Sequence, residues 1–473
     1  MASSRRRERI VVDSIHGDIH LSDQEWNVVN TGSFQRLRQI KQIGMGHFTY
    51  PNATHTRFAH SLGVLGIMIR VLRAAKEGGV RLREKMRENL RLAALLHDIG
   101  HYPYSHVMES IDSVKLTEEM IEDKGAVKRS LDMTTRRYPS HEEVGRLIVT
   151  CQEDIVQAIG GPERAAAVAD LFTRSEAANP QLSKLIHSSL DMDRLDYLLR
   201  DSRAAGVPYG TIDINYILNN VMVSKGGLLG VSRKALPAVE QFLLARHFMH
   251  RAVYYHKTTV ALEEACRQLL RRLRSRSTRN YDVPKDGFGV EKWVKSPELG
   301  TFTDAFVDGV VQAAVSDEDK VVCALASCIF RRRPPKLLKE VSALLRAGDA
   351  TGGVAISLFR ANFRHQIAGL AARHSLDPRL FLFWEAKPLK FEERGASIRA
   401  TDVDKLADEQ EEEAIKVFVE GGDELRSIMD IDHSLMALCA GHLFYALRLY
   451  VVCPNDGVVE ALRNEVASWD RDS

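Results

Sequence analysis

Residues 95–106 read Leu95-Leu96-His97-Asp98-Ile99-Gly100-His101-Tyr102-Pro103-Tyr104-Ser105-His106. The apolar residues at and before the start of this segment predict a helix over residues 90–99, and Gly100 is well placed to end it. An adjacent histidine and aspartate at the end of an apolar helix are costly to bury unless they are paired or bind a metal. The segment therefore indicates either a capped helix end with hydrogen-bonded histidines or a metal site.

Helical patterning extends outward from this segment over residues 23–272. Apolar residues recur three and four positions apart, as in Leu62, Leu65, Ile69 and Leu72. Further helices are predicted over residues 182–202 and 236–273. A hairpin is predicted over residues 10–21, where β-branched runs flank His16-Gly17-Asp18. We therefore expect the main domain to be α-helical.

The residue composition and the helical periodicity change after residue 275. Residues 275–300 are rich in serine, proline, glycine and charge and indicate a junction, and residues 302–347 return to a helical pattern. Strands are predicted over residues 381–384 and 446–452, with an acidic run at 408–413 that is typical of a solvated helix face. The fold is therefore predicted to be mainly α, a helical bundle with a small α/β C-terminal lobe. We expect four parts: a basic segment and hairpin (1–22), the main domain (23–275), a helical extension (276–377) and the lobe (378–473).

The composition is that of a globular protein and excludes several classes. The 473 residues are 45% hydrophobic and 27% charged, and 65 Lys and Arg against 63 Asp and Glu give a formal net charge of +2. Such a near-neutral chain is not built mainly to neutralise a phosphate backbone, so nucleic acid is not expected as its main ligand. No apolar run is long enough to predict a membrane helix, and the arginine-rich start is not a secretory signal. The scattered cysteines then indicate reduced thiols in a cytoplasmic protein.

Two other predicted helices carry side chains that could join His97 and Asp98. His60 lies on an upstream helix, and a downstream helix carries Asp191, Asp193 and Asp196. At about 100° per residue, Asp193 shares a face with Asp196. Imidazole and carboxylate ligands on separate helices are how a helical bundle builds a metal centre in its core. The alternative is that the carboxylates are solvated, but the leucines among them indicate a half-buried helix.

Several ordered blocks carry a family resemblance. They are Phe34-Gln35-Arg36-Leu37-Arg38, Ile40-Lys41-Gln42, residues 55–63, residues 100–106, Ser140-His141-Glu142 and residues 250–257. These blocks accompany an H…HD…D signature, which is formed by His60, His97-Asp98 and Asp193. The chain resembles the HD-domain deoxynucleoside triphosphate triphosphohydrolases, both the catalytic domain of the animal members and the bacterial members. The resemblance covers about residues 9–340 well and the rest loosely.

The resemblance implies a ligand set for a metal. His60, His97, Asp98 and Asp193 would hold one divalent transition metal. Manganese, iron, nickel and zinc all suit these ligands. Mg²⁺ is expected in addition, bridging the triphosphate.

The resemblance also implies catalytic and substrate-binding roles. His141, oriented by Glu142, would protonate the leaving sugar oxygen, so that attack at the α-phosphorus releases a deoxynucleoside and tripolyphosphate. His101 and His106 would line the α-phosphate pocket, with Glu109 as the acidic partner of His106. The expected substrate-binding residues are Gln42, Ile43, Arg57, Arg194, Tyr197, Asp201, Arg246, Tyr254 and Tyr255.

A nucleotide effector site between subunits is implied as well. The residues at its positions are Arg9, Ile10, Asn30, Gln35 and Arg38. Asn30 stands where the family usually has aspartate, whose two oxygens accept hydrogen bonds from guanine, whereas an amide offers one acceptor and one donor. We therefore expect a nucleotide-regulated homo-oligomer, a dimer or a tetramer, without a strict requirement for guanine.

Two other classes stay open. An HD-domain phosphohydrolase or phosphodiesterase acting on other nucleotides is one, although the long insertion between His106 and His141 argues against it. A single-strand nuclease or nucleic-acid binder is the other, supported by the short basic runs Arg5-Arg6-Arg7 and Arg271-Arg272. Nothing in the residues decides between nucleotide-pool balance and antiviral defence as the biological role.

Overall fold

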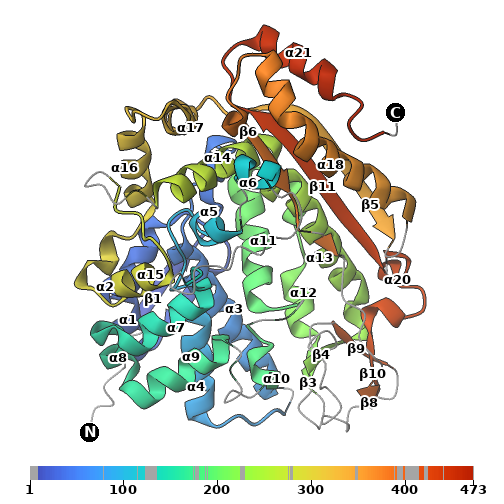
Figure 1. The fold of residues 1–473 in the computed structure, drawn as a ribbon. Helices are drawn as coiled ribbons and strands as arrows, with labels where there is room; N and C mark the ends of the chain where they lie inside the picture. Colours follow the sequence, from blue (N-terminus) through green and yellow to red (C-terminus); the bar gives the residue numbers. More distant parts are fainter. Residues whose placement is uncertain are drawn as a thin grey trace, which may run out of the picture.

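Helices make up most of the protein, and small sheets lie at its edges (Figure 1). The computed structural model describes residues 9–77, 79–113, 116–122, 136–173, 175, 180–186, 188, 190–223, 229–274, 276, 281–346, 350–387, 389–390, 398–399, 415–419, 424–439 and 441–471. Arg5-Arg6-Arg7 and the acidic run at 408–413 lie outside these residues. The architecture confirms the predicted mainly α fold with a C-terminal α/β lobe.

Five helices form the centre of the bundle. They are α3 (Arg57–Glu77), α4 (Glu84–Leu96), α7 (His141–Cys151), α9 (Pro162–Thr173) and α11 (Met192–Ala205). Helix α3 contacts both α4 and α11. It is long and apolar enough to cross a membrane, but 67% of the 18-residue stretch that meets this criterion is buried inside the fold. A Cβ added at Gly63 would lie 2.0 Å from Asp196 Oδ1, so this glycine lets α11 approach α3 closely.

Helix α4 ends at Leu96, three residues earlier than predicted, and residues 97–100 continue as a turn. Gly100 does not act as a left-handed cap, because it is not among the glycines of positive φ. A Cβ at Gly100 would instead lie 2.0 Å from the carbonyl oxygen of His141 and 2.2 Å from the amide nitrogen of Gly145. Glycine is therefore needed because the turn packs directly against the start of α7.

The other two long helices predicted here are broken. Residues 182–202 contain the end of α10 (Pro180–Ser183) and most of α11, and the described residues between them (184–186, 188, 190 and 191) are not helical. Asp191 accepts a hydrogen bond from the Arg194 amide at 2.7 Å and starts a new helix. Residues 236–273 contain α13 (Leu236–Met249), a π-helical turn over His250–Tyr254 and α14 (Lys257–Leu273). The chain is extended at His256, whose ring caps α14. The prediction of one continuous helix in each range was wrong.

The predicted N-terminal hairpin is confirmed. Strands β1 (Arg9–Asp13) and β2 (Gly17–Leu21) pair antiparallel. Gly17 has a φ of +73°, which favours glycine in the turn. The carboxylate of Asp13 accepts hydrogen bonds from the amides of Ile15 and His16, each at 2.9 Å, and this places His16 against the bundle.

The C-terminal lobe is built on a sheet of order β5-β11-β6, with β7 (Leu389–Lys390) also paired to β11. Strands β6 (Phe381–Glu385) and β11 (His442–Val451) confirm the predicted pair. Strand β5 (Lys336–Arg346) corrects the last part of the helical prediction for residues 302–347, because β5 pairs with β11. The earlier part is confirmed by helices over residues 304–314 and 320–330. Helices α18 (Ala350–Arg373) and α21 (Asp456–Val466) cover the sheet at the upper right of Figure 1.

A second sheet joins the lobe to the main domain, and it was not predicted. Its order is β3 (Val221–Val223), β4 (Leu229–Ser232), β9 (Lys416–Phe418), β10 (Glu424–Ser427) and β8 (Ile398–Arg399). Strands β4 and β9 pair in parallel although about 185 residues separate them in the chain. The lobe is thus tied to the main domain through backbone hydrogen bonds.

The main apolar core continues across the predicted boundary after residue 275. Tyr281, Val290 and Val307 belong to the same buried cluster as the residues of α3 and α11. The helices of this part are α15 (Gly287–Val294), α16 (Asp304–Ala314) and α17 (Lys320–Phe330). The remaining described α-helices are α1 (Asp23–Val29), α2 (Gly32–Gln35), α5 (His106–Glu109), α6 (Thr117–Glu122), α8 (Glu153–Ile159), α12 (Ile214–Asn219) and α20 (Leu435–Cys439).

Candidate active site

Two buried imidazoles present free ring nitrogens to one point between α3, α4 and α11. His60 Nδ1 lies 2.7 Å from Asp196 Oδ2, and His97 Nδ1 lies 2.8 Å from the carbonyl oxygen of Ala94. These partners fix each ring with Nε2 on the other side. Both Nε2 atoms are buried and have no hydrogen-bond partner. An unpartnered buried nitrogen calls for an explanation, and a metal ligand is one.

Two carboxylates complete this group of donors. Asp193 Oδ1 lies 2.9 Å from His60 Nε2 and 3.8 Å from His97 Nε2. The Asp98 oxygens lie 3.4 Å from each of the same nitrogens. Ligands held at about 2.1 Å from one ion are about 3.0 to 3.4 Å apart for right-angled to tetrahedral geometry. The spacing and the donor types therefore fit a divalent metal held by the four residues that the sequence predicted.

Asp196 and two of its partners support this group, and sequence reasoning did not assign them. The Asp196 carboxylate is fully buried and contacts His60, His16 Nε2 at 2.6 Å, and Nε and Nη2 of Arg200 at 2.8 Å each. Arg200 Nη1 also donates to Asp13 at 2.9 Å. Burial disfavours ionisation of Asp196, but Arg200 and the two histidines hold its pKa far below the usual range. The shared helix face of Asp193 and Asp196 was the signal that could have identified this role.

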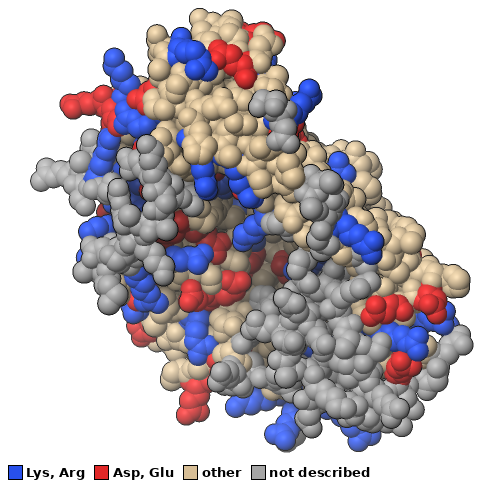
Figure 2. All heavy atoms as spheres, turned by 45° about the vertical axis from the view of Figure 1, so that its right-hand side comes forward, with Lys and Arg blue, Asp and Glu red and all other residues tan. Residues whose placement is uncertain are grey.

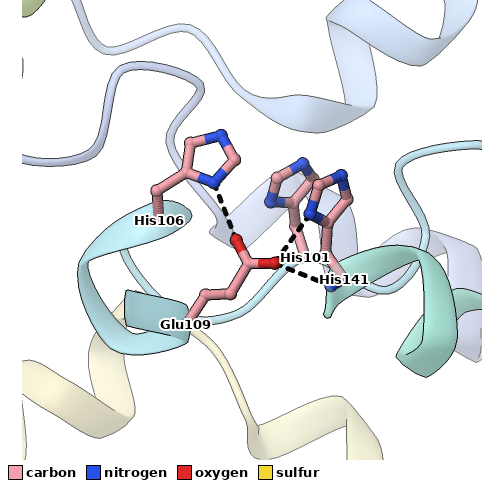
Figure 3. Close-up of side chains that lie close together, drawn as sticks. All are labelled: His101, His106, Glu109 and His141. Atoms are coloured by element: carbon pink, nitrogen blue, oxygen red, sulfur yellow. Dashed lines mark hydrogen bonds and ion pairs between the residues drawn. The ribbon is translucent and has the colours of Figure 1, made fainter. Parts of the chain in front are cut away.

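A second cluster lies next to the first and contains His101, His106, Glu109 and His141 (Figure 3). The rings of His101 and His141 stack with centroids 4.1 Å apart. Glu109 lies between His106 and His141, with 2.7 Å from Oε2 to His106 Nδ1 and 2.9 Å from Oε1 to His141 Nδ1. Glu109 Oε1 also accepts from the backbone amide of His141 at 2.8 Å. This one carboxylate fixes the position and tautomer of two histidines.

The structure corrects the predicted partner of His141. Glu109, rather than Glu142, orients the ring through Nδ1, and Glu142 lies 3.5 Å from the opposite nitrogen, Nε2. The sequence assigned Glu109 to His106 alone. Its second contact arises because Gly100 and α5 bring residues distant in sequence together, which spacing along the chain does not reveal.

The two stacked histidines differ in charge. Burial disfavours the charged form of His141, but the hydrogen bond and negative charge of Glu109 outweigh burial and raise its pKa to about 8. For His101, burial and the positive charge of Arg57 lower the pKa well below its ordinary value. At neutral pH His141 is therefore protonated and His101 is neutral, which suits a proton donor beside a neutral ring.

Both clusters open into one large cavity. Its volume is about 1500 Å³, above the roughly 300–1,000 Å³ of most small-molecule sites. Figure 2 shows a hollow with acidic and basic side chains around it. The predicted site residues that line the cavity are Gln42, Ile43, Arg57, His97, Asp98, His101, His106, Glu109, His141, Glu142, Asp193, Arg194, Tyr197, Asp201, Tyr254 and Tyr255. His60 is fully buried and is not among the residues that line the cavity.

Several of these substrate-binding candidates already have protein partners. Arg57 donates to Asp98 Oδ2 at 2.6 Å, and Arg194 donates to Asp191 Oδ2 at 2.5 Å. Tyr254 donates to Asp201 Oδ2 at 2.8 Å.

The predicted residue Arg246 is not among those that line the cavity, but its charge acts on Tyr197 and His250, which do line it. Contact of Arg246 with substrate stays a prediction.

The predicted effector residues lie on β1 (Arg9 and Ile10), at the end of α1 (Asn30), at the end of α2 (Gln35) and in the 3₁₀ turn that follows (Arg38). Arg9 sits over the ring of Trp26 at 5.0 Å, and Arg38 Nε donates to Gln35 Oε1 at 2.7 Å. Ile10 is 47% exposed. Asn30 is also exposed, and its Nδ2 donates to the carbonyl oxygen of Trp26 at 2.7 Å. One N–H of this amide is thus used within α1, which leaves the other N–H and the oxygen available to a ligand.

Comparison with known proteins places two family regions on the chain. The HD domain matches residues 57–201, and an HD-associated region matches residues 212–282. An uncharacterized Mycoplasma pneumoniae protein, the MG461 homolog, is 31% identical over 340 residues, which cover 70% of this chain and 75% of that protein. The uncharacterized Bacillus subtilis protein YwfO is 31% identical over 277 residues, 58% of each chain.

More distant relatives have assigned names. Deoxynucleoside triphosphate triphosphohydrolase SAMHD1 from Bos taurus is 26% identical over 267 residues, which cover 53% of this chain and 45% of that protein. The chain spans about half the length of several of the curated relatives it matches. Among solved structures, a Bacteroides thetaiotaomicron phosphohydrolase has the same fold, with a TM-score of 0.67 at 23% identity over 94% of this chain and 99% of that one.

Proposed function

Because this chain belongs to the HD-domain family, we propose that it is a metal-dependent phosphohydrolase acting on deoxynucleoside triphosphates. The observation that carries the proposal is that His97, Asp98 and Asp193, with the buried His60 next to them, line the same cavity as His141, whose pKa is raised to about 8. Relatives named as deoxynucleoside triphosphate triphosphohydrolases in Dictyostelium discoideum, Bos taurus and Gallus gallus support this substrate class.

His60, His97, Asp98 and Asp193 would hold the metal. When bound, a divalent ion supplies positive charge that polarises a phosphate oxygen and makes water a stronger nucleophile at neutral pH. The donor set suits manganese, iron, nickel or zinc, and Mg²⁺ on the triphosphate is part of the proposal. Asp196 holds His60 in the tautomer that leaves Nε2 free.

The chain's own residues account for the departure of the leaving group. His141 carries its transferable proton on Nε2, because Nδ1 is held by Glu109. Donation of this proton to the 5′ oxygen of the sugar lets the bond to the α-phosphorus break without releasing an alkoxide. The products are a deoxynucleoside and tripolyphosphate. His101, which is neutral beside His141, can hydrogen-bond an α-phosphate oxygen without competing for the proton.

Phosphate binding requires an exchange of partners at Arg57 and Arg194. Each guanidinium is paired with a carboxylate in this structure, Arg57 with Asp98 and Arg194 with Asp191. A phosphate group presents two oxygens that a guanidinium can bind in a bidentate way, and a triphosphate carries more charge than a carboxylate, so arginine is well suited to move between the two. Ile43 and Tyr254 are proposed to close around the sugar, where their bulk disfavours a 2′-hydroxyl.

The direct test is to incubate the metal-loaded protein separately with each dNTP, with GTP, with cyclic dinucleotides and with single-stranded oligonucleotides. The proposal expects tripolyphosphate from dNTPs and much slower cleavage of GTP than of dGTP. Shortened oligonucleotides, or hydrolysis of cyclic dinucleotides without any tripolyphosphate, would replace it with one of the two alternative classes.

Regulation and assembly are part of the same proposal. Arg9, Arg38 and the free oxygen of Asn30 can contact the phosphates and base of a nucleotide between subunits of a homo-oligomer. A single amide oxygen accepts less well from guanine than a carboxylate does, so activation by several nucleotides is expected. Turnover of one dNTP with each other nucleotide added, followed in parallel by sedimentation, checks both points. A cytoplasmic location remains a prediction.

A further inference from the structure

A row of aromatic rings follows one wall of the cavity, from α11 to the C-terminal lobe. Its members are Tyr197, Tyr254, His250, Tyr255 and Trp384, and all five line the cavity. Successive centroids are 6.1, 5.0, 5.5 and 5.4 Å apart, each pair edge-to-face. Burial and nearby arginines lower the pKa of His250 to about 3, so that its ring is neutral at neutral pH.

Trp384 is the outermost ring of this row and comes from a different part of the chain. It lies on β6 of the C-terminal lobe, whereas the family regions end at residue 282. Its side chain is half-buried, so part of the indole remains open to the cavity. The lobe therefore forms a piece of the cavity wall that the family match does not cover.

Hydrogen bonds and a cation–π contact fix the positions of Tyr255 and Trp384. Arg448 on β11 is 6% exposed and donates to the carbonyl oxygen of Tyr255 at 2.5 Å. Its guanidinium also lies 5.1 Å from the Trp384 ring centroid, and Glu340 neutralises it at 3.1 Å. The Tyr255 hydroxyl donates to the carbonyl oxygen of Lys387 at 3.2 Å. Rings fixed in this way lose little freedom when a ligand binds.

The two ends of the cavity differ in chemistry. One end holds the donor set, Arg57 and three histidines, which suit phosphate. The lobe side holds Trp384 beside the Arg360–Glu385 ion pair and Lys387, and aromatic side chains bind nucleobases by stacking. We infer that Trp384, with Tyr255, forms a subsite for the nucleobase, so that the C-terminal lobe takes part in base selection. This inference rests on the proposed function for the identity of the ligand as a nucleotide.

The experiment measures dissociation constants by calorimetry on the metal-loaded full chain. The probes are non-hydrolysable analogues of dGTP and dTTP, and inorganic tripolyphosphate, which lacks a base. The variants are Trp384→Leu, which keeps apolar bulk without a π face, and Trp384→Phe, which keeps the π face. Leu438→Ala is the control, since Leu438 is a 75% exposed residue of the same lobe that does not line the cavity.

Stacking on one aromatic side chain changes affinity by roughly 5- to 150-fold. Trp384→Leu should therefore weaken both nucleotide analogues within that range, the purine more than the pyrimidine, and leave tripolyphosphate binding unchanged. Trp384→Phe should recover most of the loss, and Leu438→Ala should match the wild type. If Trp384→Leu binds the nucleotide analogues as tightly as the wild type does, the inference is overturned. It is also overturned if Trp384→Leu loses as much affinity for tripolyphosphate as for the nucleotide analogues.

The outcome is separable from that of the proposed function. If the wild type binds nucleotides in a Trp384-dependent way but releases no tripolyphosphate from dNTPs, the subsite stands and the proposed reaction is wrong. If dNTPs are cleaved with the same KM and kcat in Trp384→Leu, the reaction stands and the subsite is wrong. A wild type that binds none of the nucleotide analogues overturns both.

Discussion

At the scale of single residues, the strongest feature is the pair of imidazole nitrogens left without a partner in the core. His60 Nε2 and His97 Nε2 face Asp98 and Asp193, and a hydrogen bond at Nδ1 fixes each ring. Desolvating these groups is costly unless something satisfies them, and a bound cation does so.

Removing one carboxylate from this set should release the metal. Asp193→Ala is expected to lose bound transition metal and hydrolysis while it keeps its helical content, because Asp196 still joins α11 to α3 through His60. Elemental analysis after dialysis and circular dichroism measure the two properties. Glu460→Ala, an exposed carboxylate in α21, is the control. Full metal content in Asp193→Ala would remove this residue from the site.

The proton on His141 predicts the alkaline limb of the pH profile. Burial works against this charge, but Glu109, with smaller effects from Glu142 and Asp98, raises the pKa to about 8. A group with a raised pKa is protonated below that value and loses its proton as the pH rises through it. The rate should therefore fall above about pH 8.

Glu109→Gln tests the cause of this shift. Without the negative charge of Glu109, the effect of burial is no longer outweighed, and the pKa of His141 falls. The alkaline limb of kcat/KM against pH should move to lower pH than in the wild type. A limb at the same pH in both proteins would show that another group supplies the proton.

At the scale of elements, the site depends on how closely the turn after α4 approaches α7. A Cβ at Gly100 would overlap backbone atoms of His141 and Gly145, which cannot move as a flexible side chain can. Gly100→Ala should lower the free energy of unfolding by about 1–3 kcal/mol and displace His141 from Glu109. Urea denaturation and turnover check the two effects.

The matched control is Gly309→Ala in α16, where an added Cβ meets nothing within 4 Å. This change should keep or raise stability, since alanine is favoured over glycine inside a helix by about 0.5–1 kcal/mol. Equal behaviour of the two variants would show that the close approach at Gly100 is not needed.

Sequence periodicity predicted the existence of most elements but not where they break. The hairpin, β6 and β11 were predicted because alternation and turn residues are local signals. The breaks at Asp191 and His256 were missed, since capping by one polar side chain competes with a continuous apolar pattern. Strand β5 was missed because its partner β11 lies about 100 residues away.

The same contrast holds for the site. The four metal-ligand candidates were found through their pattern, and the structure brings them together. The support from Asp196, His16 and Arg200, and the double role of Glu109, were not found, because each depends on contacts between distant segments.

At the scale of the whole molecule, the cavity is shared between the bundle and the C-terminal lobe. The bundle supplies the donor set and the histidines, and the lobe supplies Trp384 and neighbouring residues of β6. A sheet that joins β4 to β9 connects the two parts. Phosphate chemistry and recognition of the base are therefore proposed to lie on different parts of the chain.

The most direct test of the central claim is mass spectrometry of the products formed from dGTP in ¹⁸O-labelled water by the metal-loaded protein. Attack of water at the α-phosphorus with proton donation to the 5′ oxygen predicts unlabelled deoxyguanosine and tripolyphosphate that carries one ¹⁸O. Deoxyguanosine monophosphate with pyrophosphate, deoxyguanosine diphosphate with phosphate, or label in the nucleoside would contradict the account.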